Sequence, residues 1–163
     1  CSAPAQQDEQ LSREPVFSAA PAPEWSALFK RDHGWFGGDG IYSIALNGAA
    51  KKAAGKKDSV LIWFSDTLLG NINDSLETGF TMINNSMALL TGGRPDSTAL
   101  HFYWNKSDDH HPSSVFVPNT PLTQQGEYYW LGDGFVNTER NNAIYIFGYR
   151  VKNIPGQAVF GFQ

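Results

Sequence analysis

The chain has 163 residues, of which 41% are hydrophobic, 13% aromatic and only 17% charged. This length suits one domain, and the 16 glycines and 9 prolines favour short strands joined by turns over a coiled coil or a helical bundle. A formal net charge of −4 argues against duplex nucleic acid as a partner, and no apolar run is long enough for a membrane-spanning helix.

The first 23 residues differ from the rest of the chain. They are rich in Ala, Pro, Ser, Gln and acidic residues, which predicts a disordered tether over residues 1–23. Cys1 is the single cysteine, so no internal disulfide is available to it. A chain that starts at Cys is typical of a processed bacterial lipoprotein. We therefore expect a lipid on Cys1 that anchors the protein to the membrane of the bacterial cell envelope, and Ser2 favours the outer membrane or cell surface. The alternative is a chain boundary without biological meaning.

Residues 24–163 are predicted to form an all-β domain of antiparallel sheets. Pro23 followed by Glu24 predicts a short helical turn over residues 23–30. Beyond it, runs of β-branched and aromatic residues alternate with Gly, Asn, Asp and Pro, which is the pattern of hairpins. No amphipathic helix lies between these runs, and this excludes a parallel βαβ sheet. The predicted strands cover residues 40–46, 59–65, 80–90, 99–105, 114–117, 127–137, 143–152 and 158–162.

Two connections between predicted strands carry clusters of charge. Residues 47–58 contain four lysines and are interpreted as a solvated hairpin tip, with a basic ligand-binding loop as the alternative. Residues 106–112 contain two Asp and two His, which are metal-ligand types. Because adjacent residues of one loop rarely all reach the same ion, no metal site and no cofactor are predicted.

Two Gly-Asp-Gly segments, at residues 38–40 and 132–134, suggest an internal repeat. An apolar and aromatic strand follows each of them, and the spacing differs between the copies by about the length of the Lys-rich loop. Repeated sheet units of this kind predict blades of a β-propeller. The alternative is chance recurrence of a common turn tripeptide.

Three aspartates, Asp39, Asp66 and Asp133, are candidate catalytic residues. The glycines beside Asp39 and Asp133 leave space for a substrate to approach, and Asp66 ends a very apolar strand where it would be partly desolvated. Glycosidic bond cleavage uses carboxyl groups in unlike environments, because one must donate a proton while another stays ionised. The alternative is that each aspartate only binds turn amides.

Side chains near these aspartates are candidate sugar-binding residues. Aromatic rings stack on sugar faces, and five such rings surround the candidate aspartates: Trp35, Trp63, Tyr128, Tyr129 and Trp130. Packing between sheets is the alternative. His33 is predicted to line the same cavity, with a plain surface position as its alternative. The expected partner is therefore a polysaccharide or oligosaccharide.

Four motifs in order carry a family resemblance: residues 34–43 (GWFGGDGIYS), 63–67 (WFSDT), 83–86 (INNS) and 129–134 (YWLGDG). From about residue 25 to 150 the chain resembles the N-terminal half of a bacterial family of secreted proteins and lipoproteins that carry a domain of unknown function. That family is similar to five-bladed β-propeller glycoside hydrolases and is related to endo-acting D-arabinofuranosidases.

The resemblance implies roles for particular residues. Asp39 and Asp66 become the main carboxylates, Asp133 a third acid or a group that adjusts their pKa, and Asn85 a residue that holds the sugar or orients Asp66. Relatives commonly have Gly where this chain has Ser65, a small change that is expected to keep the turn. A five-bladed ring needs about twice this length, so we expect a partial propeller that belongs to a larger domain.

Three functions follow from these observations. The first is a surface-anchored glycoside hydrolase that acts on extracellular polysaccharide through paired carboxylates and is furanosidase-like by resemblance. The second is a non-catalytic glycan-binding lipoprotein of the same fold. The third is a structural propeller without a sugar site, which would have Asp39 and Asp66 both buried and fully bonded to backbone amides. The oligomeric state is not predicted.

Overall fold

The computed structural model describes residues 17–48, 58–72, 79–156 and 160–162. Cys1 and most of the predicted tether lie outside these residues, so the lipid on Cys1 stays a prediction. Most of the Lys-rich loop, residues 49–57, also lies outside them. Within the described part of the chain, no helix is long and apolar enough to cross a membrane.

The described chain is all-β with antiparallel pairing, as predicted, and its helical elements are short. The elements in chain order are α1 (Pro23–Ala27), β1 (His33–Gly38), β2 (Tyr42–Ala45), β3 (Ser59–Phe64), β4 (Thr67–Asn71), β5 (Thr81–Ile83), β6 (Ser86–Thr91), β7 (Leu100–Tyr103), β8 (Asn105–Lys106), β9 (Pro112–Ser113), β10 (Glu127–Asn137), the 3-10 helix η1 (Thr138–Arg140), β11 (Ala143–Asn153) and β12 (Phe160–Phe162).

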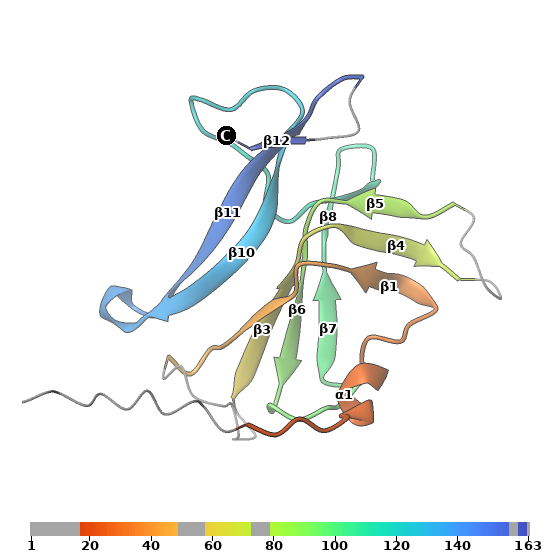
Figure 1. Ribbon diagram of the computed structural model, residues 1–163, viewed down its shortest axis with the longest axis vertical. Coiled ribbons are helices and arrows are strands. Elements are labelled where there is room, and N and C mark those ends of the chain that lie inside the picture. Colours follow the sequence, from red (N-terminus) through yellow and green to blue (C-terminus); the bar gives the residue numbers. More distant parts are fainter. Residues whose placement is uncertain (1–16, 49–57, 73–78, 157–159, 163) are drawn as a thin grey trace, which may run out of the picture.

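These strands form three main groups, which Figure 1 shows as separate directions in space. One sheet has the order β2-β3-β6-β7, and a second has the order β1-β4-β5. In Figure 1 the strands of the second sheet run across the direction of β3, β6 and β7. The third group is the long β10–β11 hairpin, with β12 added to β11, and a small β8–β9 ribbon accompanies the sheets.

Strand β3 is buried on both faces, which explains its continuous apolar sequence. Because successive side chains of a strand point to opposite faces, Ile62 and Phe64 enter one core while Leu61 and Trp63 enter another. The first core also contains Leu28, which follows α1, together with Trp35 of β1 and Leu69 of β4. The second contains Leu131 of β10, so it holds the long hairpin against the β2-β3-β6-β7 sheet.

Three pairs of consecutive strands are each joined by a short bend, and the three bends lie along one line, which we call the corner. β1 passes into β2 at residues 39–41, β3 into β4 at residues 65–66, and β5 into β6 at residues 84–85. On one side of the corner the strands pair as β1-β4-β5, and on the other side as β2-β3-β6. The first Gly-Asp-Gly, the predicted Asp66 and the predicted Asn85 therefore share one line across the fold.

Most predicted strands are present, and the differences have physical causes. The strand predicted over 80–90 is divided at the corner into β5 and β6. The strand predicted over 114–117 is absent, because the backbone of Phe116 is bonded to the side chain of Asn85 instead of a neighbouring strand. Strands β1 and β4 were not predicted, since their glycines lower strand propensity.

Candidate active site

Asp39 and Asp66 lie side by side at the corner. The backbone N–H of Asp39 donates to the carbonyl of Asp66 at 3.1 Å, and the N–H of Ser65 donates to the carbonyl of Asp39 at 2.9 Å. These two bonds fix the two backbones relative to each other. Gly40, with a φ of +54°, allows the chain to turn there, and this is the conformation that glycine adopts most easily. Residues that are 27 apart in sequence numbering are thus joined into one site.

The two carboxyl groups interact electrostatically. Partial burial, and after it the charge of Asp66, raise the pKa of Asp39 above its ordinary value of 3.8. Hydrogen bonds from backbone amides oppose this rise without cancelling it. Asp39 therefore keeps its proton to a higher pH than an isolated aspartate does, which is the property that a proton donor needs.

Strand β10 closes the site on the other side of Asp66. The indole Nε1–H of Trp130 donates to Oδ1 of Asp66 at 2.9 Å. Asp66 lies between β3 and β4, whereas Trp130 lies on β10, so the bond joins the β10–β11 hairpin directly to the corner. A ring that was predicted to stack on sugar thus also holds a candidate catalytic carboxylate.

Two buried side chains, those of Trp63 and Ser65, fasten β10 to the corner around Trp130. Trp63 donates its indole N–H to the carbonyl of Gly132 at 2.7 Å. The hydroxyl of Ser65 accepts from the N–H of Leu131 at 2.9 Å and lies 3.3 Å from the carbonyl of the same residue. The Ser65 hydroxyl therefore binds the next hairpin as well as occupying the expected turn.

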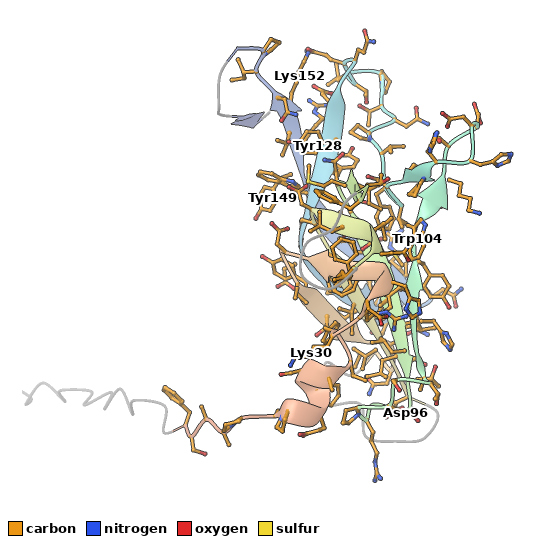
Figure 2. All side chains as sticks on the ribbon, turned by 90° about the vertical axis from the view of Figure 1, so that its right-hand side faces the viewer. Lys30, Asp96, Trp104, Tyr128, Tyr149 and Lys152 are labelled. Atoms are coloured by element: carbon orange, nitrogen blue, oxygen red, sulfur yellow. The ribbon has the colours of Figure 1, made fainter. Side chains whose placement is uncertain are left out.

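Tyr128 and Asn153 belong to the same neighbourhood, and of these two only Tyr128 was singled out from the sequence, as a candidate sugar-stacking ring. Tyr128 lies on β10 and donates from its hydroxyl to Oδ1 of Asn153, at the end of β11, at 3.0 Å. Burial and the charge of Asp66 raise the pKa of the Tyr128 phenol above its usual value, so this phenol lies within electrostatic reach of Asp66. Figure 2 shows Tyr128 on the long hairpin, at the opposite end of the molecule from Lys30 and Asp96. The alternation along β10 places Tyr128 on the same face as Trp130, whereas no local pattern pointed to Asn153.

Two predicted sugar-binding residues are buried and have structural contacts instead. Trp35 is 3% exposed and lies within the first core, where its ring packs at 4.5 Å from Phe102 and 4.8 Å from Phe64. Its faces are not accessible to a sugar, so the packing alternative describes it correctly.

Asn85 is also fully buried, at 0% exposure. Its amide group donates to the carbonyls of Phe116 and Tyr129, and its side-chain oxygen accepts from the N–H of Phe116. All of these partners are backbone groups. Asn85 therefore positions β10 beside the corner, and its side-chain bonds go to backbone groups and not to Asp66.

The remaining predicted residues are distributed around the site. Tyr129 packs into the second core and lines an apolar hollow with Leu61 and Ile146. His33 begins β1, six residues before Asp39, which in an extended strand corresponds to roughly 20 Å. Its ring nitrogen lies 2.5 Å from Asp32 and the side chain is exposed, so the surface alternative describes it.

Asp133 makes its hydrogen bond within its own strand. Its carboxylate accepts from the N–H of Gly134 at 2.7 Å, in a bulge of β10 where the register with β11 shifts. The same carboxylate lines a cavity of about 630 Å³ whose other walls include Ile44 of β2 and Val60 of β3. It is not part of the contacts that join Asp39, Asp66 and Trp130.

The loop with two Asp and two His forms local contacts. Ser107 donates to Asp109, and His111 lies 3.7 Å from Asp109. Among the described residues, no group of three or more His, Cys, Asp or Glu side chains is arranged to hold a metal ion.

Comparison with known protein families identifies the family of this chain. The family described as "Domain of unknown function (DUF5005)" matches residues 23–163. The chain belongs to this family. The matched DUF5005 segment includes every residue of the corner and of the long hairpin, whereas it leaves out the predicted tether. No curated protein gives a significant match to the sequence.

A solved structure resembles the DUF5005 chain in fold. It is described as "a putative hydrolase" from Bacteroides ovatus, and it superimposes with a TM-score of 0.60 at 22% sequence identity. The superposition covers 80% of this chain and 34% of the other, so the chain spans about a third of the length of that protein.

Proposed function

We propose that the corner is the acid–base site of a glycoside hydrolase. The observation that carries this proposal is the pairing of Asp39 and Asp66, in which partial burial and the neighbouring charge raise the pKa of one carboxyl group. Cleavage of a glycosidic bond needs such an unequal pair. The likeness to a Bacteroides ovatus protein described as a hydrolase supports a hydrolytic reaction.

In this proposal the two aspartates have different roles. Asp39 is the general acid, and it gives its proton to the glycosidic oxygen as the bond from that oxygen to the anomeric carbon breaks. The ionised Asp66 faces the positive charge that develops on the sugar, either as nucleophile or as the base that activates water. Because Asp39 is only partly shielded from solvent and Asp66 is bonded to an indole, the pair does not have the fully buried, amide-bonded state expected of a purely structural propeller.

The proposed fold is a partial five-bladed β-propeller. The β2-β3-β6-β7 sheet is a four-stranded antiparallel unit, and it packs face to face with the β10–β11 hairpin, as neighbouring blades do. The outer side of this hairpin leaves Tyr145 42% and Phe147 60% exposed, which is apolar surface that a further blade would cover.

The proposed substrate is an extracellular polysaccharide, and the proposed location is the cell surface through the lipid on Cys1. Support for a sugar comes from Tyr128 and Trp130, which are partly exposed and lie beside Asp66 with their rings 6.0 Å apart. Each combines an apolar ring with a polar group, which suits a ligand that has both C–H faces and hydroxyls.

The test is hydrolysis of a polysaccharide panel that includes furanose-containing polymers, measured as release of reducing ends. We expect Asp39→Asn and Asp66→Asn each to lower kcat by about 10²- to 10⁴-fold, which is the usual contribution of an acid–base group. Asp133→Asn is the matched control, because it removes the aspartate at the same position of the second Gly-Asp-Gly, outside the contacts of Asp39 and Asp66, and its kcat should stay within about twofold. Full activity in both Asp39→Asn and Asp66→Asn would overturn the site.

Glycan binding without catalysis is the second candidate, and the Tyr128–Trp130 pair is the observation that favours it. It predicts that the panel contains a ligand but no substrate. Calorimetric binding that is lost in a Tyr128→Ala, Trp130→Ala double variant, together with no release of reducing ends, would support binding over hydrolysis.

A further inference from the structure

We propose that Trp130 is a positioning residue that holds the Asp66 carboxylate in its working orientation. This inference rests on the proposed function of the corner and deepens it. Trp130 comes from β10, whereas Asp66 lies between β3 and β4, so the proposal makes the long hairpin a necessary part of the site.

The first argument is the bond itself. An indole N–H can donate a hydrogen bond and cannot accept one, so the Asp66 oxygen at 2.9 Å must be the acceptor. Hydrogen bonds to an ionised acceptor are stronger and more directional than those between neutral groups. The bond therefore restricts rotation of the carboxylate about its side-chain torsion.

The second argument is that Trp130 cannot easily move away. The residues on both sides of it are bonded to the corner: Tyr129 through Asn85, and Leu131 through Ser65. Gly132 accepts from Trp63, whose side chain is fully buried. Because Tyr129, Leu131 and Gly132 are all bonded to the corner, the backbone of Trp130 is fixed and its indole N–H stays directed at Asp66. A group that positions a reactive side chain must be fixed in this way.

The third argument is the orientation of the ring. Trp130 meets the ring of Tyr128 at 6.0 Å with an interplanar angle of 68°, an edge-to-face arrangement that also fixes the indole plane. Stacking on a sugar alone would require neither the N–H bond nor this degree of fixation. A positioning role requires both.

The experiment uses Trp130→Phe in the full chain, which keeps an aromatic ring and removes the N–H. On a polysaccharide that the wild type cleaves, we expect kcat to fall about 10- to 100-fold, the effect of losing one hydrogen bond to a charged group, with KM little changed. A ring that only stacks on the substrate predicts the opposite, with KM raised in Trp130→Ala and kcat preserved in Trp130→Phe.

A second measurement is independent of catalysis. In ¹H–¹⁵N spectra, the indole resonance of Trp130 should move with pH together with the carboxyl carbon of Asp66, and it should shift in Asp66→Ala. The matched control is Trp25→Phe, which removes a partly exposed indole from α1 away from the corner and should change neither kcat nor the Trp130 resonance.

The outcomes separate this inference from the proposed function. If hydrolysis is found but Trp130→Phe has wild-type kcat and its indole resonance ignores Asp66, the positioning role is overturned while the hydrolase stands. If the indole resonance follows Asp66 but no glycan is cleaved, the positioning of Asp66 is supported and the proposed catalytic function is overturned.

Discussion

The two Gly-Asp-Gly segments have the same sequence and different structures. At residues 38–40 the strand ends, the chain turns through Gly40 with a φ of +54°, and β1 gives way to β2. At residues 132–134 the strand continues, and β10 accommodates the tripeptide as a bulge between Leu131 and Gly134. An antiparallel strand pair accompanies each segment, β2–β3 in the first case and β10–β11 in the second, but the two segments place their aspartates differently.

The comparison shows that the neighbouring strand determines where the aspartate of a Gly-Asp-Gly segment is placed and what it contacts. Asp39 lies beside the bend at Ser65 and Asp66, so a second carboxylate is brought to it. Asp133 lies opposite the continuous strand β11 and bonds to its own Gly134. A carboxylate in this motif becomes part of a pair only where the partner strand also bends and carries an acid.

The largest expected effect comes from filling the bulge of the second copy. A Cβ at Gly134 would lie 2.5 Å from the carbonyl oxygen of Tyr145 and 3.0 Å from the ring of Trp63, neither of which can move freely. We expect Gly134→Ala to lower the free energy of unfolding by about 3 kcal/mol in urea titrations.

Gly126→Ala is the control for that experiment. It has a φ of +82° but nothing within 4 Å of its Cβ, so backbone strain alone should cost about 1 kcal/mol. Equal losses in Gly134→Ala and Gly126→Ala would show that the bulge is not closely packed.

A smaller effect is expected at the turn of the first copy. A Cβ at Gly40 would lie 2.8 Å from Oγ of Ser65, and the positive φ adds strain. We expect Gly40→Ala to cost about 2 kcal/mol in the same urea titrations. Because the obstacle is a side-chain hydroxyl, Gly40→Ala combined with Ser65→Gly should cost less than the sum of the two single changes. Strict additivity would contradict this contact.

The smallest effect concerns the pKa of Asp39. The folded protein holds this proton to a higher pH than the unfolded chain, whose carboxyl keeps the ordinary value of 3.8. Between the two pKa values the folded state binds more protons, so this group makes the free energy of unfolding fall as pH rises through that window. In Asp66→Asn the pKa of Asp39 should move part of the way down, because burial, the larger cause, remains.

The measurement is a pH titration of the Asp39 carboxyl carbon by NMR in both proteins. An Asp39 titration that is identical in the wild type and in Asp66→Asn would show that the two carboxylates do not interact, and it would remove the main support for an unequal pair.

Local sequence predicted much of the fold because burial and pairing leave local patterns. The run from Ser59 to Phe64 is apolar throughout, as a strand between two cores must be. The hairpin over residues 127–153 was predicted almost to the residue, since both strands are rich in aromatic and β-branched residues. By contrast, the glycines in β1 and β4 lower strand propensity, so these two strands were not predicted.

The site was predictable only in part. The aspartates beside bends were found from their neighbours in sequence, and Asp39 and Asp66 are indeed adjacent. The roles of Trp130 and Asn85 depend on partners 64 and 44 residues away, and no local pattern indicates which distant group a donor will meet. Trp35 shows the converse error, because an aromatic residue next to a motif is as well suited to a core as to a sugar.

The docking of β10 on the corner also sets an order of events during synthesis. By the time residue 117 has been made, both aspartates and all strands of the corner exist, yet the indole that holds Asp66 has not been translated. At that stage the nascent chain contains Asp39 and Asp66 but still lacks Trp130, the hydrogen-bond donor to Asp66. The side chains of Trp63 and Ser65, and one of the amide N–H groups of Asn85, find their backbone partners on β10, so the docking of β10 satisfies these buried groups and supplies the indole to Asp66 in one step.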